Sequence, residues 1–128
     1  MTSAIPKSQI PLLTLAAIAL ASPAQAMPCS ETPARIEMAV SLRKADEDRP
    51  VHVTFRTRAE GVRLTPFLLE KYPDEMTIVL QYQFNKLVVK DDRFEVGLWF
   101  KRRYERLVVP FDAVKGFWDT EVRRCGEE

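Results

Sequence analysis

The sequence predicts a mainly β fold with one or two short helices, folded as a small antiparallel β-sandwich or a partly open barrel. Residues 72–119 alternate apolar and polar side chains through several short runs, which is the pattern of half-buried strands. Charged pairs and prolines separate these runs, so the connections are tight and favour antiparallel pairing. The chain has 128 residues, which is enough for one domain with a modest core.

A linker with one short helix is expected over residues 27–50. Residues 34–45 place Ile36, Val40 and, less well aligned, Leu42 on one side of a helix, and the charged residues 45–50 end it. The folded domain is expected to follow at residues 51–123, with residues 124–128 as a short tail.

The domain is expected to begin with a half-buried strand at residues 51–57, where Val51, Val53 and Phe55 alternate with polar side chains. Thr65 and Pro66 then resemble an N-cap followed by proline in the first helical position, which predicts a short helix that ends before Pro73.

The remaining strands are expected at residues 76–83, 87–90, 93–101, 105–109 and 116–122. In the first of these, alternation places Tyr82 on the same face as the apolar residues Met76, Ile78 and Leu80. Turns are expected at Asp91-Asp92 and at Arg102-Arg103, and a turn or single helical turn at residues 112–115. Such a sheet has edges, and an edge can accept an extended peptide as an added strand.

The charge balance argues against a nucleic-acid partner. The 19 basic and 18 acidic side chains nearly cancel, whereas DNA binding needs a net or clustered positive charge. Residues 101–106 (KRRYER) are the densest basic segment, and their aromatic residue suggests a weaker RNA-binding alternative, but a solvated turn is preferred. We therefore expect neither DNA nor RNA as a partner.

No catalytic arrangement is visible, so the chain is not expected to be an enzyme. His52 lies in mid-strand without a serine, cysteine or paired carboxylate near it in sequence, and the acidic pairs occur at predicted turns. One histidine and two cysteines do not make a convincing zinc site, and no cofactor is expected.

The first 26 residues have the pattern of a secretory signal peptide. They contain a single charge, at Lys7, an apolar run at residues 12–21 and the small-residue cleavage pattern Ala24-Gln25-Ala26. The run is too short to span a bilayer as a helix. A miscalled start or a disordered or packed N-terminal segment remains the alternative. Export would place Cys29 and Cys125 where they could form a disulfide, whereas in the cytosol they would be ordinary thiols.

The candidate binding residues are Gln81, Gln83, Asn85 and Trp99. If their apolar neighbours fill the core, these side chains face outward or line a groove, where amides can bond a peptide backbone and an aromatic ring provides a wall. The alternative is that they are ordinary surface positions on a sheet.

Three segments in order resemble the stringent starvation protein B family of adaptors for the ClpXP protease. They are KYPDEMTIVLQYQFNKLVV, DRFEVGLWF and ERLVVPFDAVKGFWD, and the resemblance covers roughly residues 50–119. It implies a small β-sandwich with strands wrapped as in an Sm-like barrel, a homodimer formed through an N-terminal helix, and a groove for extended ssrA tags. It also implies a separate C-terminal peptide that tethers the adaptor to the ClpX unfoldase, so that bound cargo gains effective concentration.

The resemblance assigns Gln81, Gln83 and Phe84 to a glutamine-rich segment beside the tag groove, and Trp99 to the strand that flanks it. Asn85 replaces a tryptophan of the family, and Trp99 replaces a smaller or polar residue, so the groove is expected to be reshaped or partly filled.

The chain also departs from the family at both ends. The dimerisation helix is expected to be missing or degenerate, and the last strand and the ClpX-binding tail to be absent. The resemblance implies a cytoplasmic adaptor that binds tags, and the expected lack of the tail implies that it delivers them inefficiently. The alternative is an exported, periplasmic β-domain with a Cys29–Cys125 disulfide and an unknown binding role.

Overall fold

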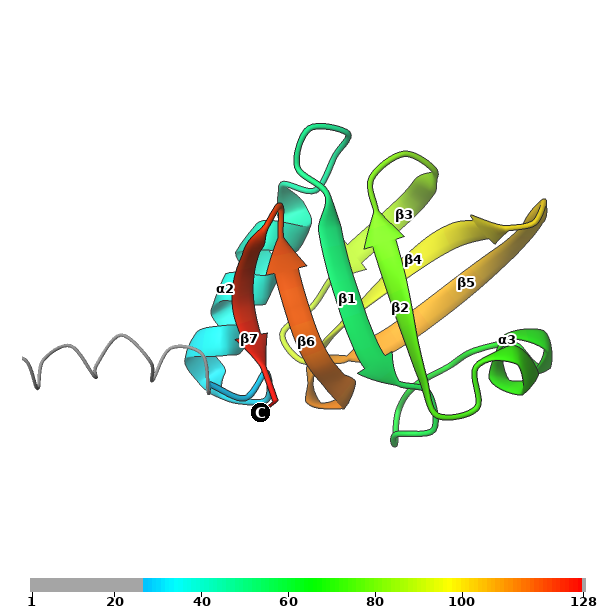
Figure 1. Ribbon diagram of the computed structural model, residues 1–128, viewed down its shortest axis with the longest axis horizontal. Helices are drawn as coiled ribbons and strands as arrows, with labels where there is room; N and C mark the ends of the chain where they lie inside the picture. The colour runs from blue at the N-terminus through cyan, green and yellow to red at the C-terminus, as the bar shows by residue number, and fades with distance from the viewer. Residues whose placement is uncertain (1–26, 128) are drawn as a thin grey trace, which may run out of the picture.

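The computed structural model describes residues 27–127 (Figure 1). The signal-like pattern of residues 1–26 lies outside the described residues. The elements in chain order are α2 (Thr32–Arg43), β1 (Val51–Arg56), α3 (Pro66–Lys71), β2 (Glu75–Leu80), β3 (Phe84–Val89), β4 (Arg93–Phe100), β5 (Arg103–Pro110), the 3-10 helix η3 (Phe111–Ala113), β6 (Val114–Asp119) and β7 (Val122–Gly126).

The strands form two antiparallel sheets, which confirms the predicted β-sandwich. One sheet has four strands in the order β2-β1-β6-β7, and the other has three in the order β3-β4-β5. Figure 1 shows the four-stranded sheet in front of the three-stranded one, with α2 behind β7 and α3 at the opposite side. Among the described strands the two sheets stay separate, so they do not close into a barrel.

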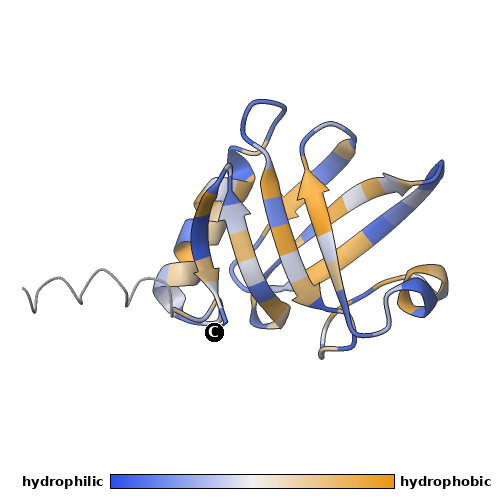
Figure 2. Ribbon diagram, in the orientation of Figure 1, coloured by the Kyte–Doolittle hydropathy of each residue, from blue (hydrophilic) through white to orange (hydrophobic). Residues whose placement is uncertain are grey.

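The core lies between the sheets and follows the predicted alternation. Val51, Val53 and Phe55 of β1 are fully buried, and their neighbours in sequence are half-buried. The same banding is visible along the front strands in Figure 2. Four phenylalanines supply the largest fully buried side chains, and each contributes about 1.5–3 kcal/mol through removal of its apolar surface from water. They are Phe55, Phe94, Phe111 and Phe117.

Helix α2 forms where a helix is expected, but it buries a different face. Its buried residues include Ala34, Met38 and Leu42, which follow one another at the i, i+4 spacing of a single helical face. Ile36 and Val40 were predicted to share one side of the helix with Leu42; they lie on its outer side, 60% and 45% exposed, whereas Leu42 is buried. Ala34, Met38 and Leu42 follow the i, i+4 spacing more closely than Ile36, Val40 and Leu42 do. This buried row faces β7 and β3.

A disulfide joins Cys29, just before α2, to Cys125 in β7. The two Cα atoms lie 5.1 Å apart, the residues are 96 positions apart in sequence, and both side chains are buried. The amide of Gly126 also donates to the carbonyl of Met27 at 2.9 Å. The strand β7 itself corrects two predictions: the last strand is not absent, and residues 124–126 belong to a strand rather than to a tail.

Three local predictions differ from the structure. Strand β2 ends at Leu80, so Tyr82 lies beyond it and is 70% exposed instead of facing the core. The turn between β4 and β5 is formed by Lys101 and Arg102, one residue earlier than expected. Thr65 does precede α3, but its hydroxyl makes no capping bond.

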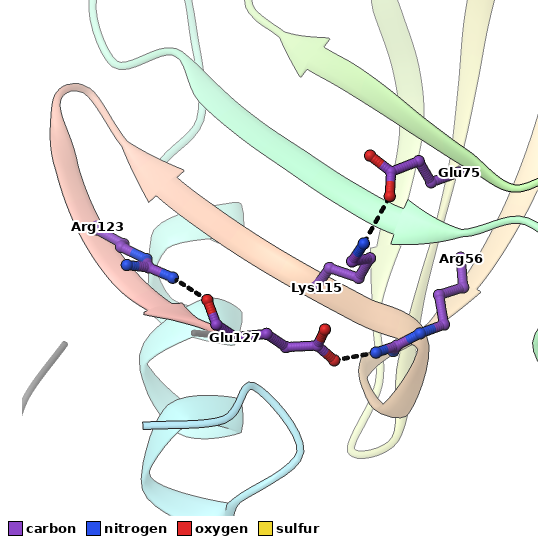
Figure 3. A network of polar contacts seen from close by, with 5 residues as sticks. All are labelled: Arg56, Glu75, Lys115, Arg123 and Glu127. Carbon is purple, nitrogen blue, oxygen red and sulfur yellow. Dashed lines mark hydrogen bonds and ion pairs between the residues drawn. The ribbon is translucent and has the colours of Figure 1, made fainter. Parts of the chain in front are cut away.

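Surface ion pairs reach across the four-stranded sheet, each passing over an intervening strand (Figure 3). Lys115 Nζ of β6 donates to Glu75 Oε1 of β2 at 2.6 Å, and Arg56 of β1 pairs with Glu127. Arg123 donates to the Glu127 carbonyl at 2.8 Å. Pairs this exposed contribute little to stability, typically about 0–1 kcal/mol each.

No described helix is long and apolar enough to cross a membrane.

Candidate functional site

A groove of about 480 Å³ lies between the two sheets where they diverge. One side is residues 77–79 of β2, one end is the linker at residues 81–83, and the other side is residues 98–100 of β4. A second hollow of about 390 Å³ shares Tyr82, Gln83 and Trp99 with the first and adds Phe84 and Asn85. The shared residues make the two hollows parts of one groove.

Both sides of the groove carry strand edges that have no strand partner among residues 27–127. β2 is the outer strand of its sheet, so one row of its backbone groups has no neighbouring strand. β4 runs past the beginning of β3: Phe84 pairs with Leu98, whereas Trp99 and Phe100 pair only with β5. Free amides and carbonyls of this kind can accept an extended chain through main-chain hydrogen bonds.

The two glutamines of the linker differ in how freely they can bind a ligand. Gln81 is half-buried, and its Nε2 donates to the Glu47 carbonyl at 3.1 Å, which anchors the linker to the loop before β1. Gln83 is exposed and has no hydrogen-bond partner for its side chain within residues 27–127. We therefore expect Gln83 to be the amide available to a ligand and Gln81 to position the linker.

Trp99 forms a wall of the groove and does not plug it. Its indole is 44% exposed and meets the Tyr104 ring edge-on, with centroids 4.7 Å apart. Tyr104 Oη donates to Asn85 Oδ1 at 2.8 Å, which connects β5 across β4 to β3. Gly97 makes this arrangement possible, because a Cβ there would stand 1.9 Å from Tyr104 Oη. The side chain at position 99 is thus held by a packed neighbour that is itself hydrogen-bonded.

All four residues predicted for peptide binding, Gln81, Gln83, Phe84 and Trp99, line the groove. Phe84 is half-buried and packs against the core, so it forms part of the floor. The residues that sequence reasoning missed include Tyr82 and the 43% exposed Val79. Alternation assigned Tyr82 to the core, and only the end of β2 at Leu80 places it at the groove.

The described residues give the groove amide, hydroxyl, aromatic and aliphatic side chains, and none of them brings a carboxylate, imidazole or thiol to its lining. His52 lies elsewhere, in a shallow hollow with Thr54, Thr77, Trp118, Thr120 and Glu121. No group of three or more acidic, histidine or cysteine side chains gathers at metal-binding distance within the described part of the chain. The groove therefore has the composition of a binding surface.

Comparison with known protein families identifies the family of this chain. The family model for stringent starvation protein B matches residues 34–125, which is 92 of the 128 residues. The match begins inside α2 and ends inside β7, so it includes both sheets and the whole groove. A search of curated proteins finds no match. The chain belongs to the stringent starvation protein B family.

Proposed function

We propose that this protein is a proteolysis adaptor that binds ssrA-type degradation tags in extended form and promotes their delivery to the ClpXP protease. Membership of the family suggests the ClpXP adaptor role. The observation that supports tag binding is the groove, because in the described part of the chain two unpaired strand edges border it and no charged side chain lines it. In this role the protein catalyses no reaction itself; ClpX, its partner, uses the ATP.

The physical basis of the proposal is addition of a strand. An unstructured tail can bond to the free edge of β2 or to the end of β4, and its side chains can enter the hollows beside Tyr82 and Trp99. Holding the tail near the unfoldase raises its effective concentration without any new contact in the ClpX pore. A homodimer remains a prediction drawn from the family.

Titration of a fluorescein-labelled ssrA peptide tests the binding step. We expect saturable anisotropy with a dissociation constant of tens of micromolar or tighter, about 6 kcal/mol of binding free energy. Trp99→Ala should weaken binding at least about fivefold, because it removes one aromatic wall of the groove. Ile36→Ala is the matched control, since that side chain is also apolar and exposed but lies on α2. Absence of saturable binding, or equal loss in both variants, would refute tag binding in this groove.

Delivery is a separate step with its own assay. Degradation of a tagged fluorescent protein by purified ClpXP should show a lower KM when the adaptor is added and an unchanged kcat at saturating substrate. An untagged substrate serves as the control. Binding without any change in KM would leave a tag-binding protein that is not an adaptor.

The disulfide favours a second candidate, an exported β-domain whose binding role is unknown. Disulfides persist in oxidising compartments and are rare in the cytosol, where ClpXP acts. The adaptor proposal places the protein in the cytoplasm, and this second proposal places it in the periplasm or outside the cell. Mass spectrometry of the native protein distinguishes them. An N-terminus at Met27 and a mass two hydrogens below that of the fully reduced chain would support export. An intact Met1 and free thiols would refute it.

A further inference from the structure

Three side chains form a connected row on the outer face of the three-stranded sheet, beside the second hollow of the groove. They come from its three strands: Asn85 from β3, Trp99 from β4 and Tyr104 from β5. Trp99 is paired directly with Tyr104, whereas Asn85 is paired with Gly97. Asn85 and Tyr104 are therefore diagonal to each other, and their side chains can meet only over β4.

Gly97 leaves the space in which these two side chains meet. A Cβ at this position would stand 1.9 Å from Tyr104 Oη and 2.6 Å from Asn85 Oδ1, so a side chain there would displace both. In this space Tyr104 Oη donates to Asn85 Oδ1 at 2.8 Å. Both side chains are exposed, so water could satisfy them almost as well, and the main effect of the bond is to fix their orientation.

The bond to Tyr104 leaves Asn85 with a free donor. A primary amide carries one carbonyl oxygen, which accepts hydrogen bonds, and an NH₂ group, which donates them. The oxygen is engaged by Tyr104, and Nδ2 has no partner within residues 27–127. Asn85 lines the second hollow together with Tyr82, Gln83 and Trp99. The group that Asn85 can offer to a molecule in this hollow is therefore an N–H donor, and the amide cannot turn over without losing the Tyr104 bond.

The fixed amide of Asn85 differs from the free amide of Gln83. The Gln83 side chain has no partner in the described part of the chain, so a ligand that bonds to it must also immobilise it. Asn85 is ordered before a ligand arrives, so a bond to it costs less conformational entropy. A fixed donor also discriminates between ligands, because it accepts only those that bring an acceptor to one point. In an extended peptide the main-chain carbonyls are acceptors of this kind.

We propose that Asn85 is a specificity-determining residue of the groove, whose Nδ2 donates to a main-chain carbonyl of the bound peptide, and that Tyr104 is the residue that positions it. The inference rests on the proposed tag-binding function and adds a polar contact at the second hollow. A neutral carbonyl suits this hollow, because none of the described residues that line it is charged.

Three substitutions separate the donor from the surrounding structure. Asn85→Asp keeps the shape and the acceptor for Tyr104 but replaces the donor with a carboxylate oxygen, so the fluorescein-labelled ssrA peptide should bind at least about tenfold more weakly. Tyr104→Phe removes only the hydroxyl and should weaken binding about twofold to fivefold, because Asn85 is no longer ordered. Lys90→Gln, at an exposed position between β3 and β4, changes the net charge as Asn85→Asp does and should leave the affinity unchanged. The loss in Asn85→Asp should persist in about 0.5 M salt, where charge repulsion is screened.

The side-chain amide of Asn85 can also be observed directly, without any substitution. Asn85 is the only asparagine of the chain, so selective ¹⁵N labelling of asparagine gives a single side-chain NH₂ group in the NMR spectrum. Addition of the ssrA peptide should move one of its two proton resonances downfield, with the same dissociation constant as the anisotropy titration. A merely structural role for Asn85 would not produce this change.

The outcomes distinguish this inference from tag binding itself. A peptide that binds the unmodified protein and the Asn85→Asp variant equally well overturns the role of Asn85 and leaves tag binding intact. Saturable binding that does not move the Asn85 side-chain resonance overturns it as well, whatever the stability of the variants. Failure of the peptide to bind the unmodified protein overturns both proposals.

Discussion

Removing the Cys29–Cys125 disulfide should destabilise the folded domain strongly. The bridge joins residues 96 positions apart, so it restricts nearly the whole of the described chain in the unfolded state. Chain-entropy arguments give about 4.7 kcal/mol for a loop of ~100 residues, and measured losses in small domains are about 2–5 kcal/mol. A domain of this size typically has about 5–15 kcal/mol of stability in total. Reduction should therefore remove at least about an eighth of the free energy of unfolding.

Urea unfolding followed by tryptophan fluorescence, with and without a thiol-free reductant, measures this loss. The Cys29→Ala/Cys125→Ala double variant is the control: its unfolding midpoint should match that of the reduced protein and should not respond to the reductant. Because α2 depends on this bridge and on its own buried face, we expect the far-ultraviolet helix signal to be lost before the sheet signal once the bond is reduced. Oxidised and reduced proteins that unfold within about 1 kcal/mol of each other would refute the reasoning.

Three further substitutions test the packing. Gly97→Ala should cost about 1–2 kcal/mol in thermal unfolding, because the new methyl group must displace the Tyr104 hydroxyl that lies 1.9 Å from its position; an unchanged melting temperature would contradict the described packing. Met38→Ala should cost about 2–5 kcal/mol in urea unfolding, whereas Ile36→Ala should cost less than about 0.5 kcal/mol, and the reverse order would mean that α2 buries the other face. Lys115→Gln should change the unfolding free energy by less than about 0.5 kcal/mol, since its ion pair is solvent-exposed; a loss above about 2 kcal/mol would contradict that assignment.

Strand positions in the core were predictable because their pattern has a period of two that only a half-buried strand satisfies. Val51, Val53 and Phe55 are apolar at every second position, and the structure buries all three. The face of α2 was harder to predict because the segment has apolar residues on several sides. Ile36 and Val40 are as apolar as Met38, and only contact with β7 and β3 decides which of them is buried.

The end of β2 shows why the groove could be only partly predicted. Alternation continues through Tyr82, so the sequence alone extends the strand to that residue and turns its ring inward. In the structure the Gln81 side chain bonds to the Glu47 carbonyl, and the chain leaves the sheet after Leu80. That contact joins residues 34 positions apart, and no local pattern predicts a contact at such a separation.

The face of β4 on which Trp99 lies was predictable from the sequence, but the effect of its indole on the shape of the groove was not. The alternation of β4 places its indole opposite the core face, as expected. Whether the indole would fill the groove or border it depends on Tyr104, which packs against the indole and lies over Gly97. These contacts come from pairing of β4 with β5 at the register Trp99–Tyr104, which depends on where the tight turn falls.

Mapping of a bound ssrA peptide by NMR tests the central proposal most directly. With the amide resonances assigned, stepwise addition of the peptide should shift residues 77–83 and 98–100 most, and nuclear Overhauser contacts should place the peptide backbone in extended form beside β2 or the end of β4. The outer face of α2 should be unaffected. Shifts centred on α2 or on the hollow around His52, or a peptide that leaves the edges of β2 and β4 free, would contradict the account.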